Sequence, residues 1–473
     1  MTRLGTGRRP RLQRKYKPSW IFALALGAAI GWGAFVLPFD WMMSAGLSGT
    51  LLGFVIGGVI ITIIAINYGL AIRAMPVTGG AINFAKTSLG DRHSFVVGWS
   101  LALGYSCIVA LNASAVTLVF RSTFPSFVMR LPLYSVAEWT IYLPEVLIAS
   151  AFIGLFAWIN ISDTELSGRF QFYAVLIMLV AVLAVSAVIG FYYFRENPEL
   201  APRFPESRSP FSAVLVILAF APWAYVGFDS IPQLAGEFNF SPKKAMALLV
   251  SGTAAASGIY SLMMITTTIA VGTKHELYAK FAWPTATAIG DIMGWPGLLL
   301  LVLAVSAGVL TGLNGFYTAA SRVIFSLGQS KMLPEWLGRL DSKKGTPKNA
   351  VLVVMALCLL TPWFGRSALT WIVDMSSAGV TVAYFYTSYF VWKVGKDGLT
   401  QSTGEPVEPN LVWKLFGLGG CLISVGFLLL LFVPGSPGAL SIPSLIALIV
   451  WVVAGVVVRN KMTRKNRSKA YFK

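Results

Sequence analysis

The sequence predicts an all-α polytopic membrane protein of about twelve transmembrane helices, and three observations support that prediction. Of the 473 residues, 56% are hydrophobic and only 12% are charged, which is too apolar for an ordinary soluble enzyme of that length. Apolar runs of about 20 residues recur along nearly the whole chain, and each can cross a hydrocarbon core about 30 Å thick as a helix. Membrane-spanning strands would instead need shorter segments that alternate in polarity.

The apolar runs lie near residues 19–41, 46–72, 94–120, 140–160, 169–194, 211–236, 245–271, 295–328, 349–365, 368–393, 411–433 and 442–459. The first run has no small-residue cleavage site after a short apolar core, so we expect it to remain as a mature span. No large soluble insertion interrupts the series. The sequence therefore predicts one transmembrane domain over 19–460 between two basic tails, 1–18 and 461–473.

Positive charge is concentrated at the two ends of the chain. The net charge is +18, and residues 1–17 and 459–473 each hold seven Lys or Arg and no acidic residue. This placement is typical of the cytoplasmic segments of a membrane protein, so we expect both tails in the cytoplasm beside the lipid bilayer, and no nucleic-acid partner. An even number of spans agrees with that topology. The connection "SDTELSGR", residues 162–169, is an exception, because it is slightly acidic although it falls on the same side.

Two of the runs are interrupted near their middle by glycine and proline. The first contains Gly31 and Gly33, and the sixth contains Pro222, Gly227 and Pro232. Interrupted helices five runs apart predict an inverted repeat. The expected divisions are repeat one over about 19–194, repeat two over about 211–393, and two extra helices over about 411–459.

Broken helices inside a membrane indicate a polar site. Backbone outside a helix is tolerated at that depth only where it lines a cavity or is buried in protein. Amides at the start of a half-helix suit a carboxylate, and carbonyls at the end of the other half suit an ammonium group or a cation. Two such breaks could grip both ends of an amino acid, although glycines also serve simply for close helix packing or a kink.

Four segments, in order over residues 20–350, resemble the amino acid–polyamine–organocation transporter superfamily. "GAAIGWGAFVLP" is similar to the first-helix motif of that family, and "MPVTGG" to its P-x-x-G-G segment. "FAPWAYVGFDSIPQLAGEFNFSPKKA" resembles its sixth helix and the loop that follows. "SRVIFSLGQSKMLP", with the later "TPKNA", resembles the end of its eighth helix and the entry to the ninth.

The resemblance implies a leucine-transporter-like inverted repeat with the substrate between helices one, three, six, eight and ten. By position, the amides around 31–33 would hold a carboxylate, the carbonyls near 220–224 would accept an ammonium, and residues 225–228 would shape the side-chain pocket or its gate. The expected substrate-binding residues are Ile30, Gly31, Trp32, Gly33, Phe220, Ala221, Ala224, Tyr225, Gly227 and Phe228.

Three departures from the family pattern bear on these expectations. Trp32 stands where relatives have Ser or Ala, and it could fill the pocket, stack on a cation or swing as a gate. The fifth run has no Lys; Met178 falls near the place where some proton-coupled relatives carry one, so the lysine-based mechanism is not supported. The usual acidic pair after helix six is Gly236 and Glu237 here, so one carboxylate is missing.

Polar residues at membrane depth are functional candidates. Asp229 could bind a cationic group, hold a proton, or cap the second half-helix of the sixth run. Thr311 and Asn314 could help bind sodium, or could bridge helices as such residues often do. For Arg322, near the inner end of the eighth run, we expect a structural ion pair or an interfacial position.

Neither histidine, His93 nor His275, has a ligand-spaced partner, so we expect no metal. No P-loop is present, which excludes direct use of ATP by that motif. We therefore expect no cofactor and no enzyme activity, only a coupling H⁺ or Na⁺ ion.

The leading hypothesis is a secondary active transporter that moves amino acids, neutral ones first, across the cytoplasmic membrane by alternating access. Its energy source would be an ion gradient or exchange. A transporter of carboxylate-free amines or polyamines is the alternative within transport. A substrate-sensing receptor and a membrane-embedded enzyme are alternatives of other classes, and the oligomeric state stays open.

Overall fold

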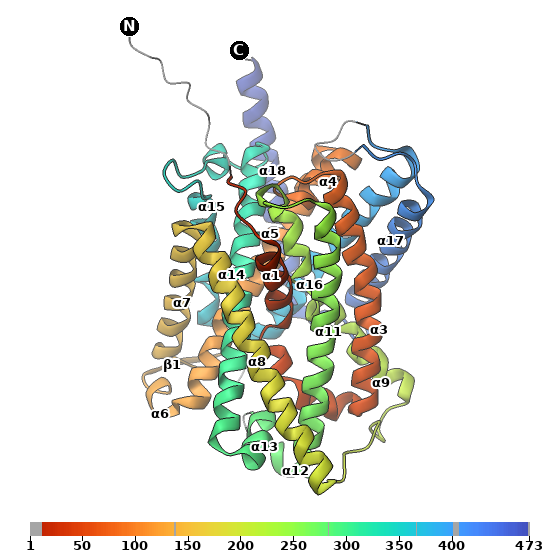
Figure 1. Cartoon of the computed structure of the whole chain (residues 1–473). Coiled ribbons are helices and arrows are strands. Elements are labelled where there is room, and N and C mark those ends of the chain that lie inside the picture. The colour runs from red at the N-terminus through yellow and green to blue at the C-terminus, as the bar shows by residue number, and fades with distance from the viewer. Residues whose placement is uncertain (1–11, 137–138, 282, 366, 401–405, 472–473) are drawn as a thin grey trace.

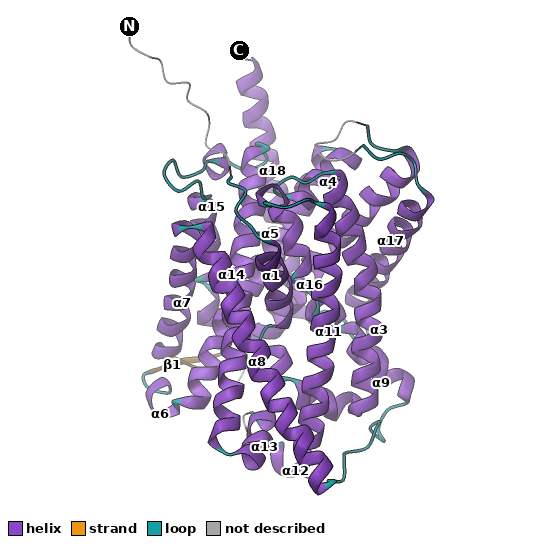
Figure 2. Cartoon of the chain, viewed as in Figure 1, coloured by secondary structure: helices purple, strands orange, loops and turns teal. Residues whose placement is uncertain are grey.

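The computed structural model describes residues 12–136, 139–281, 283–365, 367–400 and 406–471. Nearly all of this chain is helical (Figure 2). Residues 1–11 of the predicted N-terminal tail and 472–473 of the C-terminal tail lie outside the described residues. The elements are α1 Pro18–Ile30, α2 Gly33–Val36, α3 Pro38–Ala74, α4 Gly80–Leu89, α5 Asp91–Thr123, α6 Pro125–Val128, β1 Pro132–Val136, β2 Trp139–Tyr142, α7 Leu143–Ser162, α8 Thr164–Glu196, α9 Pro210–Ala219, α10 Ala221–Ala224, η1 Phe228–Glu237, α11 Lys243–Val271, α12 His275–Tyr278, α13 Pro284–Met293, α14 Trp295–Gln329, η2 Glu335–Gly338, α15 Lys348–Cys358, η3 Thr361–Phe364, α16 Ser367–Asp397, α17 Leu411–Phe432 and α18 Ile442–Tyr471.

Eight helices of the described residues are long and apolar enough to cross a membrane, and α9 with the bent segment after it makes a ninth. The eight are α3, α5, α7, α8, α11, α14, α17 and α18. The remaining predicted runs coincide with α1–α2, α15–η3 and α16. The all-α polytopic fold is thus confirmed, while the number twelve stays a prediction.

The boundary between the first two predicted runs is a kink rather than a loop. Helix continues from Pro38 to Ala74, but Gly46 has φ +67°, which interrupts the helical geometry inside α3. A side chain there would also meet the backbone of Arg203, since a Cβ would lie 2.5 Å from its carbonyl oxygen. Glycine is therefore required at this kink for conformation and for space.

Helix contacts recur with a shift of five predicted runs. α3 packs against α11, and α5 against α14, so each pair joins equivalent runs. Under the same shift α5 corresponds to α14 and α16 to α8, and both pairs, α5 with α16 and α14 with α8, are in contact. In the same way α3 corresponds to α11 and α9 to α1, and both α3 with α9 and α11 with α1 are in contact. This pattern supports the predicted inverted repeat, whose exact bounds stay a prediction.

Both ends of the described chain emerge on the same face of the helix bundle (Figure 1). The helix α4 lies on that face, while α12 and α13 cover the opposite one. A two-stranded antiparallel hairpin, β1–β2, precedes α7 near that opposite end. The short α13 and this hairpin were not predicted, because each is too short to give an apolar run.

Candidate functional site

The first helix breaks at the predicted place. Gly31 has φ +48° and ψ −160°, and α2 begins two residues later. Among the described residues, no acceptor bonds the backbone amides of residues 31–33. A Cβ added to Gly31 would have a single neighbour within 4 Å, the Oδ1 atom of Asn112 at 4.0 Å, so open space adjoins the break. The break therefore leaves open space beside Gly31, next to backbone amides that a ligand could bind.

The second break lies slightly beyond the carbonyls that the sequence singled out. The Phe220 carbonyl accepts the amide of Ala224 at 2.8 Å, and the Ala221 carbonyl accepts that of Tyr225 at 3.1 Å. The chain departs from helix at Gly227, with φ +141° and ψ −44°, before the 3₁₀ helix η1. The carbonyls of residues 220 and 221 are thus engaged inside helical turns, and the opened backbone is at residues 225–227.

Tyr260 of α11 joins the carbonyl ends of both broken helices. Its hydroxyl lies 3.0 Å from the carbonyl oxygen of Ala29, 3.2 Å from that of Ile30 and 3.1 Å from that of Ala224. One hydroxyl proton can bond only one of these oxygens at a time, so acceptors outnumber donors here. The carbonyls of Ile30 and Ala224, two expected site residues, are therefore brought together.

Two indole rings, those of Trp32 and Trp223, are in contact between the two breaks. Trp32 and Trp223 meet edge to face, with ring centroids 6.3 Å apart. A Cβ on Gly33 would lie 2.6 Å from the Trp223 ring, so this glycine is needed for the approach. Trp32 is partly exposed, and its Nε1 atom is buried without a hydrogen-bond partner. The two rings form an aromatic wall with one unused N–H donor.

Asn112 of α5 adds a polar group that the sequence analysis missed. Its Nδ2 donates to the carbonyl of Ile108 at 2.9 Å, which leaves Oδ1 on the side of Gly31. The side chain is buried and Oδ1 has no hydrogen-bond partner. A single Asn within an apolar run carries no local signal, so only the packing of α5 against α14, next to the break at Gly31, reveals it.

Asp229 lies in the first turn of η1 and bonds the backbone at the second break. One carboxylate oxygen accepts the amide of Gly227 at 2.8 Å, and the other accepts the hydroxyl of Tyr105 at 2.9 Å. The bonded amide belongs to the residue before η1 and not to η1 itself, so the capping alternative stays a prediction. The carboxyl group is fully buried, and among the described residues no Lys, Arg or His contacts it. A buried carboxyl group without a cation makes this the most polar point between α5 and η1.

The last two expected pocket residues point in different directions. Tyr225 donates its hydroxyl to the carbonyl of Phe54 at 2.6 Å, so its ring lies against α3 and away from Gly31. Phe228 stacks on Tyr384 of α16, at 5.7 Å between ring centroids, and meets the edge of Tyr68. Phe228 thus belongs to an aromatic cluster between α3 and α16.

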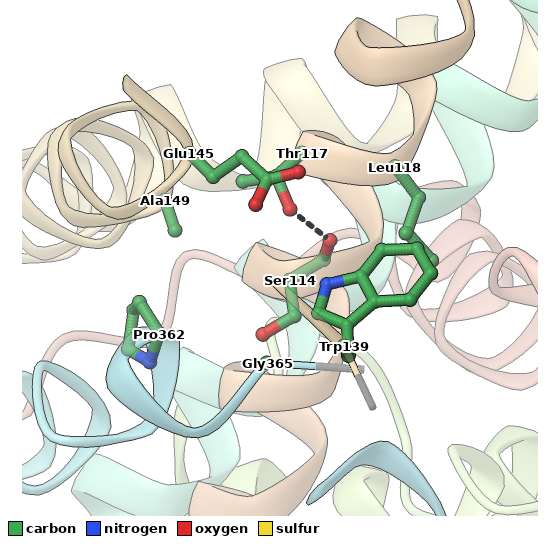
Figure 3. Close-up of a pocket in the computed structure, with 8 residues that line it drawn as sticks. All are labelled: Ser114, Thr117, Leu118, Trp139, Glu145, Ala149, Pro362 and Gly365. Atoms are coloured by element: carbon green, nitrogen blue, oxygen red, sulfur yellow. Dashed lines mark hydrogen bonds between the residues drawn. The ribbon is translucent and has the colours of Figure 1, made fainter. Parts of the chain in front are cut away.

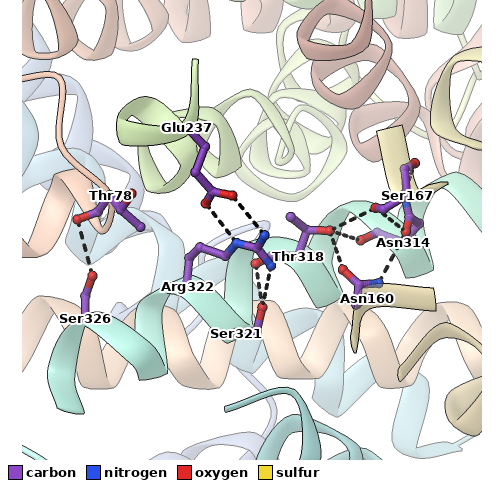
Figure 4. Close-up of polar contacts among 9 residues, drawn as sticks. All are labelled: Thr78, Asn160, Ser167, Glu237, Asn314, Thr318, Ser321, Arg322 and Ser326. Carbon is purple, nitrogen blue, oxygen red and sulfur yellow. Dashed lines mark hydrogen bonds and ion pairs between the residues drawn. The ribbon is translucent and has the colours of Figure 1, made fainter. Parts of the chain in front are cut away.

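Asn314 lies in a buried polar ladder between α14 and the helices α7 and α8 (Figure 4), whereas Thr311, farther back along α14, faces α1. The Thr311 hydroxyl is 3.0 Å from the carbonyl of Gly27 in α1. The Oδ1 atom of Asn314 accepts from Ser167 at 2.8 Å and from Asn160 at 3.3 Å. The Asn314 oxygen is therefore occupied as an acceptor, while the Thr311 hydroxyl acts as a donor to a backbone carbonyl.

Gln171 of α8 lies beside α1, at a position that the sequence analysis did not single out. Its Nε2 donates to the carbonyl of Ala23 at 3.3 Å, and its Oε1 accepts from Asn314 at 2.9 Å. Met178 is buried about two turns farther along α8. The part of α8 that faces Gly27 thus carries a neutral amide, Gln171, beside Val175.

A buried ion pair between Arg322 and Glu237 lies beyond the ladder, toward the face that bears the termini. Arg322 binds Glu237 through two hydrogen bonds of 3.0 and 3.1 Å, and both side chains are 1% exposed. The ion pair expected for Arg322 is confirmed. A Cβ on Gly236 would lie 2.6 Å from the Thr78 hydroxyl, so the missing second carboxylate would have no room.

The N-terminal segment before α1 is hydrogen-bonded to the backbone at Glu237, one member of this ion pair. Tyr16 is fully buried, and its amide donates to the carbonyl of Glu237 at 3.1 Å. Its carbonyl accepts the amide of Asn239 at 3.1 Å, and Lys15 pairs with Asp163 at 3.1 Å. The segment before α1 therefore bridges α8, α14 and the end of η1.

A small pocket lies elsewhere, toward the hairpin end of the bundle (Figure 3). It is lined by Ser114, Thr117, Leu118, Trp139, Glu145, Ala149, Pro362 and Gly365. Glu145 already binds Arg121 at 3.1 Å, and the Arg121 guanidinium lies over the Trp139 ring. None of the expected site residues lines this pocket, so it is separate from the two breaks.

Comparison with known proteins agrees with the fold and the breaks. A family model described as amino acid permease matches residues 19–457. The chain belongs to the amino acid permease family. This permease is 24% identical to the amino-acid permease RocC of Bacillus subtilis, over 88% of this chain and 90% of the relative. It is equally similar to the branched-chain amino acid permease BcaP of Lactococcus lactis, over 82% of this chain and 85% of the relative. The aromatic amino acid transport protein AroP of Escherichia coli is also 24% identical, over 74% of each chain.

Membership in this family confirms the resemblance drawn from the four segments. The protein is a multi-pass membrane permease and not an enzyme. The roles of its individual site residues stay predictions, because the three relatives are named for different sets of amino acids.

Proposed function

We propose that this permease is a secondary active transporter of α-amino acids that works by alternating access in the cell membrane, with both termini in the cytoplasm. The observation that carries the proposal is the pair of broken helices. Unbonded amides at 31–33 and clustered carbonyls at Ile30 and Ala224 offer complementary partial charges to a zwitterion. The positive-inside rule supports the topology, since residues 1–17 and 459–473 together hold 14 basic residues and no acid.

The carboxylate of the substrate would bind the amides at the first break. Its ammonium group would bind the converging carbonyls, with the Oδ1 atom of Asn112 as a further acceptor. Binding would satisfy buried groups that otherwise lack partners, each of which costs about 1–3 kcal/mol when left unpaired. A carboxylate-free amine would leave the amides at 31–33 unpaired, so α-amino acids are favoured over amines.

The walls of the site favour neutral side chains. Trp32 and Trp223 supply aromatic surface, and Asp229 uses both carboxylate oxygens as acceptors for Gly227 and Tyr105. A charged substrate side chain would meet no charged partner on the Trp32 and Trp223 rings and would bear the cost of desolvation. Neutral amino acids therefore fit the site best.

For coupling, a proton on Asp229 is favoured over sodium at Thr311 and Asn314. The Oδ1 atom of Asn314 already accepts two hydrogen bonds, and the Thr311 hydroxyl donates its proton to a backbone carbonyl. Asp229 is a buried carboxyl group that no described cationic side chain contacts, and protonation removes its charge without a metal ion.

Uptake into proteoliposomes tests the proposal. Radiolabelled neutral amino acids should accumulate when an inward proton gradient is imposed and should not respond to a sodium gradient of equal size. Substrate-dependent thermal stabilisation without accumulation under any gradient would instead support a receptor. Stabilisation by amines alone would contradict the assignment of α-amino acids.

A further inference from the structure

The last helix, α18, is far longer than a membrane requires. It contains 30 residues, Ile442–Tyr471, which corresponds to about 45 Å at 1.5 Å per residue. About 20 residues suffice for the hydrocarbon core. The helix therefore continues beyond the apolar segment, and Figure 1 shows it projecting past the other helices on the face that bears both termini.

One side of α18 fixes its orientation against the protein. Trp451 and Trp99 of α5 stack 4.4 Å apart, and each indole N–H donates to the other residue's carbonyl, at 2.9 and 3.1 Å. Gly455, one turn later, packs directly on the Trp99 ring. Asn466 then donates to the carbonyl of Lys331, just after α14, at 3.0 Å. These residues lie on one stripe at spacings of four and eleven, so the rotation of the helix is set along its length.

The opposite stripe changes from apolar to basic at a single point. Val450, Val453 and Val457 are all exposed, and Lys461 and Arg464 continue their spacing of three and four residues. Both basic side chains are exposed, and the sequence has no acidic residue after residue 408. Only 11% of the most apolar stretch of α18 is buried in the protein, the smallest share among the eight spans. The valines therefore face lipid tails, and the basic pair lies directly above them.

We propose that Lys461 and Arg464 form a binding site for the phosphate headgroups of anionic phospholipids. The stripe on which they lie already contacts lipid, so a headgroup is the nearest anion available to them. Arginine offers planar paired donors to phosphate, and lysine adds a point charge. Because Asn466 holds the helix to the end of α14, an occupied site would anchor this corner of the protein to one leaflet. The proposal does not depend on the transported substrate.

Lipid retention by the purified full-length protein tests the site. The protein is incubated with mixed micelles that contain phosphatidylglycerol or phosphatidylcholine, and the lipid that stays bound through gel filtration is measured. We expect preferential retention of phosphatidylglycerol. Lys461→Gln combined with Arg464→Gln should weaken that retention by about fivefold for each charge removed.

Two further variants control for charge and for folding. Lys274→Gln with Lys280→Gln removes the same charge from the exposed opposite end and should leave retention unchanged. Lys461→Arg with Arg464→Lys keeps both charges and should also retain the lipid. The proposal would be overturned if the Lys461→Gln, Arg464→Gln variant retained as much phosphatidylglycerol as the Lys274→Gln, Lys280→Gln variant. It would also be overturned if the unaltered protein retained phosphatidylcholine and phosphatidylglycerol equally. Displacement of phosphatidylglycerol by millimolar inorganic phosphate would show a site for free anions and would also overturn it.

Discussion

At the scale of single residues, Trp32 is the clearest departure of this permease from its family. Its ring meets Trp223 across the site, while its Nε1 atom has no hydrogen-bond partner. Removing the indole therefore breaks no hydrogen bond and enlarges the space beside Gly31. We expect Trp32→Ser to change the order of preference among substrates more than it changes stability.

Competition uptake with a panel of amino acids, together with thermal unfolding in detergent, measures both effects. Trp41→Ser is the matched control, because Trp41 is buried against Phe54 and Tyr260. Truncation of such a ring costs about 3–5 kcal/mol. If Trp32→Ser lost expression while its selectivity stayed the same, Trp32 would be a packing residue.

Asp229→Asn tests whether this carboxyl group carries the coupling proton. The variant keeps an oxygen acceptor for the amide of Gly227, so this hydrogen bond and the fold should persist. We expect exchange of labelled for unlabelled substrate to continue, while accumulation driven by a proton gradient is lost. Loss of exchange and accumulation together, with normal thermal stability, would indicate a role in binding instead.

At the scale of elements, the two glycine breaks differ in how much space surrounds them. Gly227 has a positive φ, and a Cβ there would lie 2.6 Å from the amide nitrogen of Ala29 in α1. Gly31 also has a positive φ, but its added Cβ would meet only Asn112 at 4.0 Å. We expect Gly227→Ala to abolish the folded protein, and Gly31→Ala to cost about 1–2 kcal/mol while it weakens substrate binding. Expression yield and ligand-induced thermal shifts distinguish these outcomes, and equal loss of folded protein in both variants would contradict the account.

Sequence reasoning located the broken elements because glycine and proline mark them locally. It included Gly227 in the second interruption, but two of the three carbonyls that it named there, those of Phe220 and Ala221, are engaged in helical turns. Tyr260 and Asn112 escaped prediction because their contacts with α1 depend on the packing of helices far apart in the chain. The pairing of Arg322 with Glu237 was anticipated only as an ion pair without a named partner.

At the scale of the whole molecule, the face that bears the termini is closed by the Arg322–Glu237 pair and by Tyr16. Arg322→Ala would leave a buried carboxylate without its partner, at a cost of about 3–5 kcal/mol. Arg322→Leu combined with Glu237→Leu should cost less, because neither charge is then left alone. Thermal or chemical unfolding in detergent measures both variants. Equal stability loss in the two would show that the pair contributes through packing rather than charge.

Tyr16→Ala should loosen the same face without removing a charge. We expect faster thiol labelling of a cysteine placed at Thr318 in the ladder, by a reagent added on the side of the termini. Lys17→Ala is the control, because Lys17 contacts only the Trp20 ring among the interactions described. Unchanged labelling in the Tyr16 variant would show that the segment before α1 has no part in closure.

The polar ladder also has an electrical consequence. Asn160, Ser167, Asn314 and Thr318 bond one another with exposures of at most 2%, and the single charge pair beyond them is neutral as a unit. A plug of this kind excludes mobile ions, so a large part of the membrane voltage falls across it. A zwitterion crosses that field without net electrical work, whereas a proton that crosses the whole of it gains or loses about 2.3 kcal/mol per 100 mV. Transport by this permease should therefore produce a current set by the coupled ion alone.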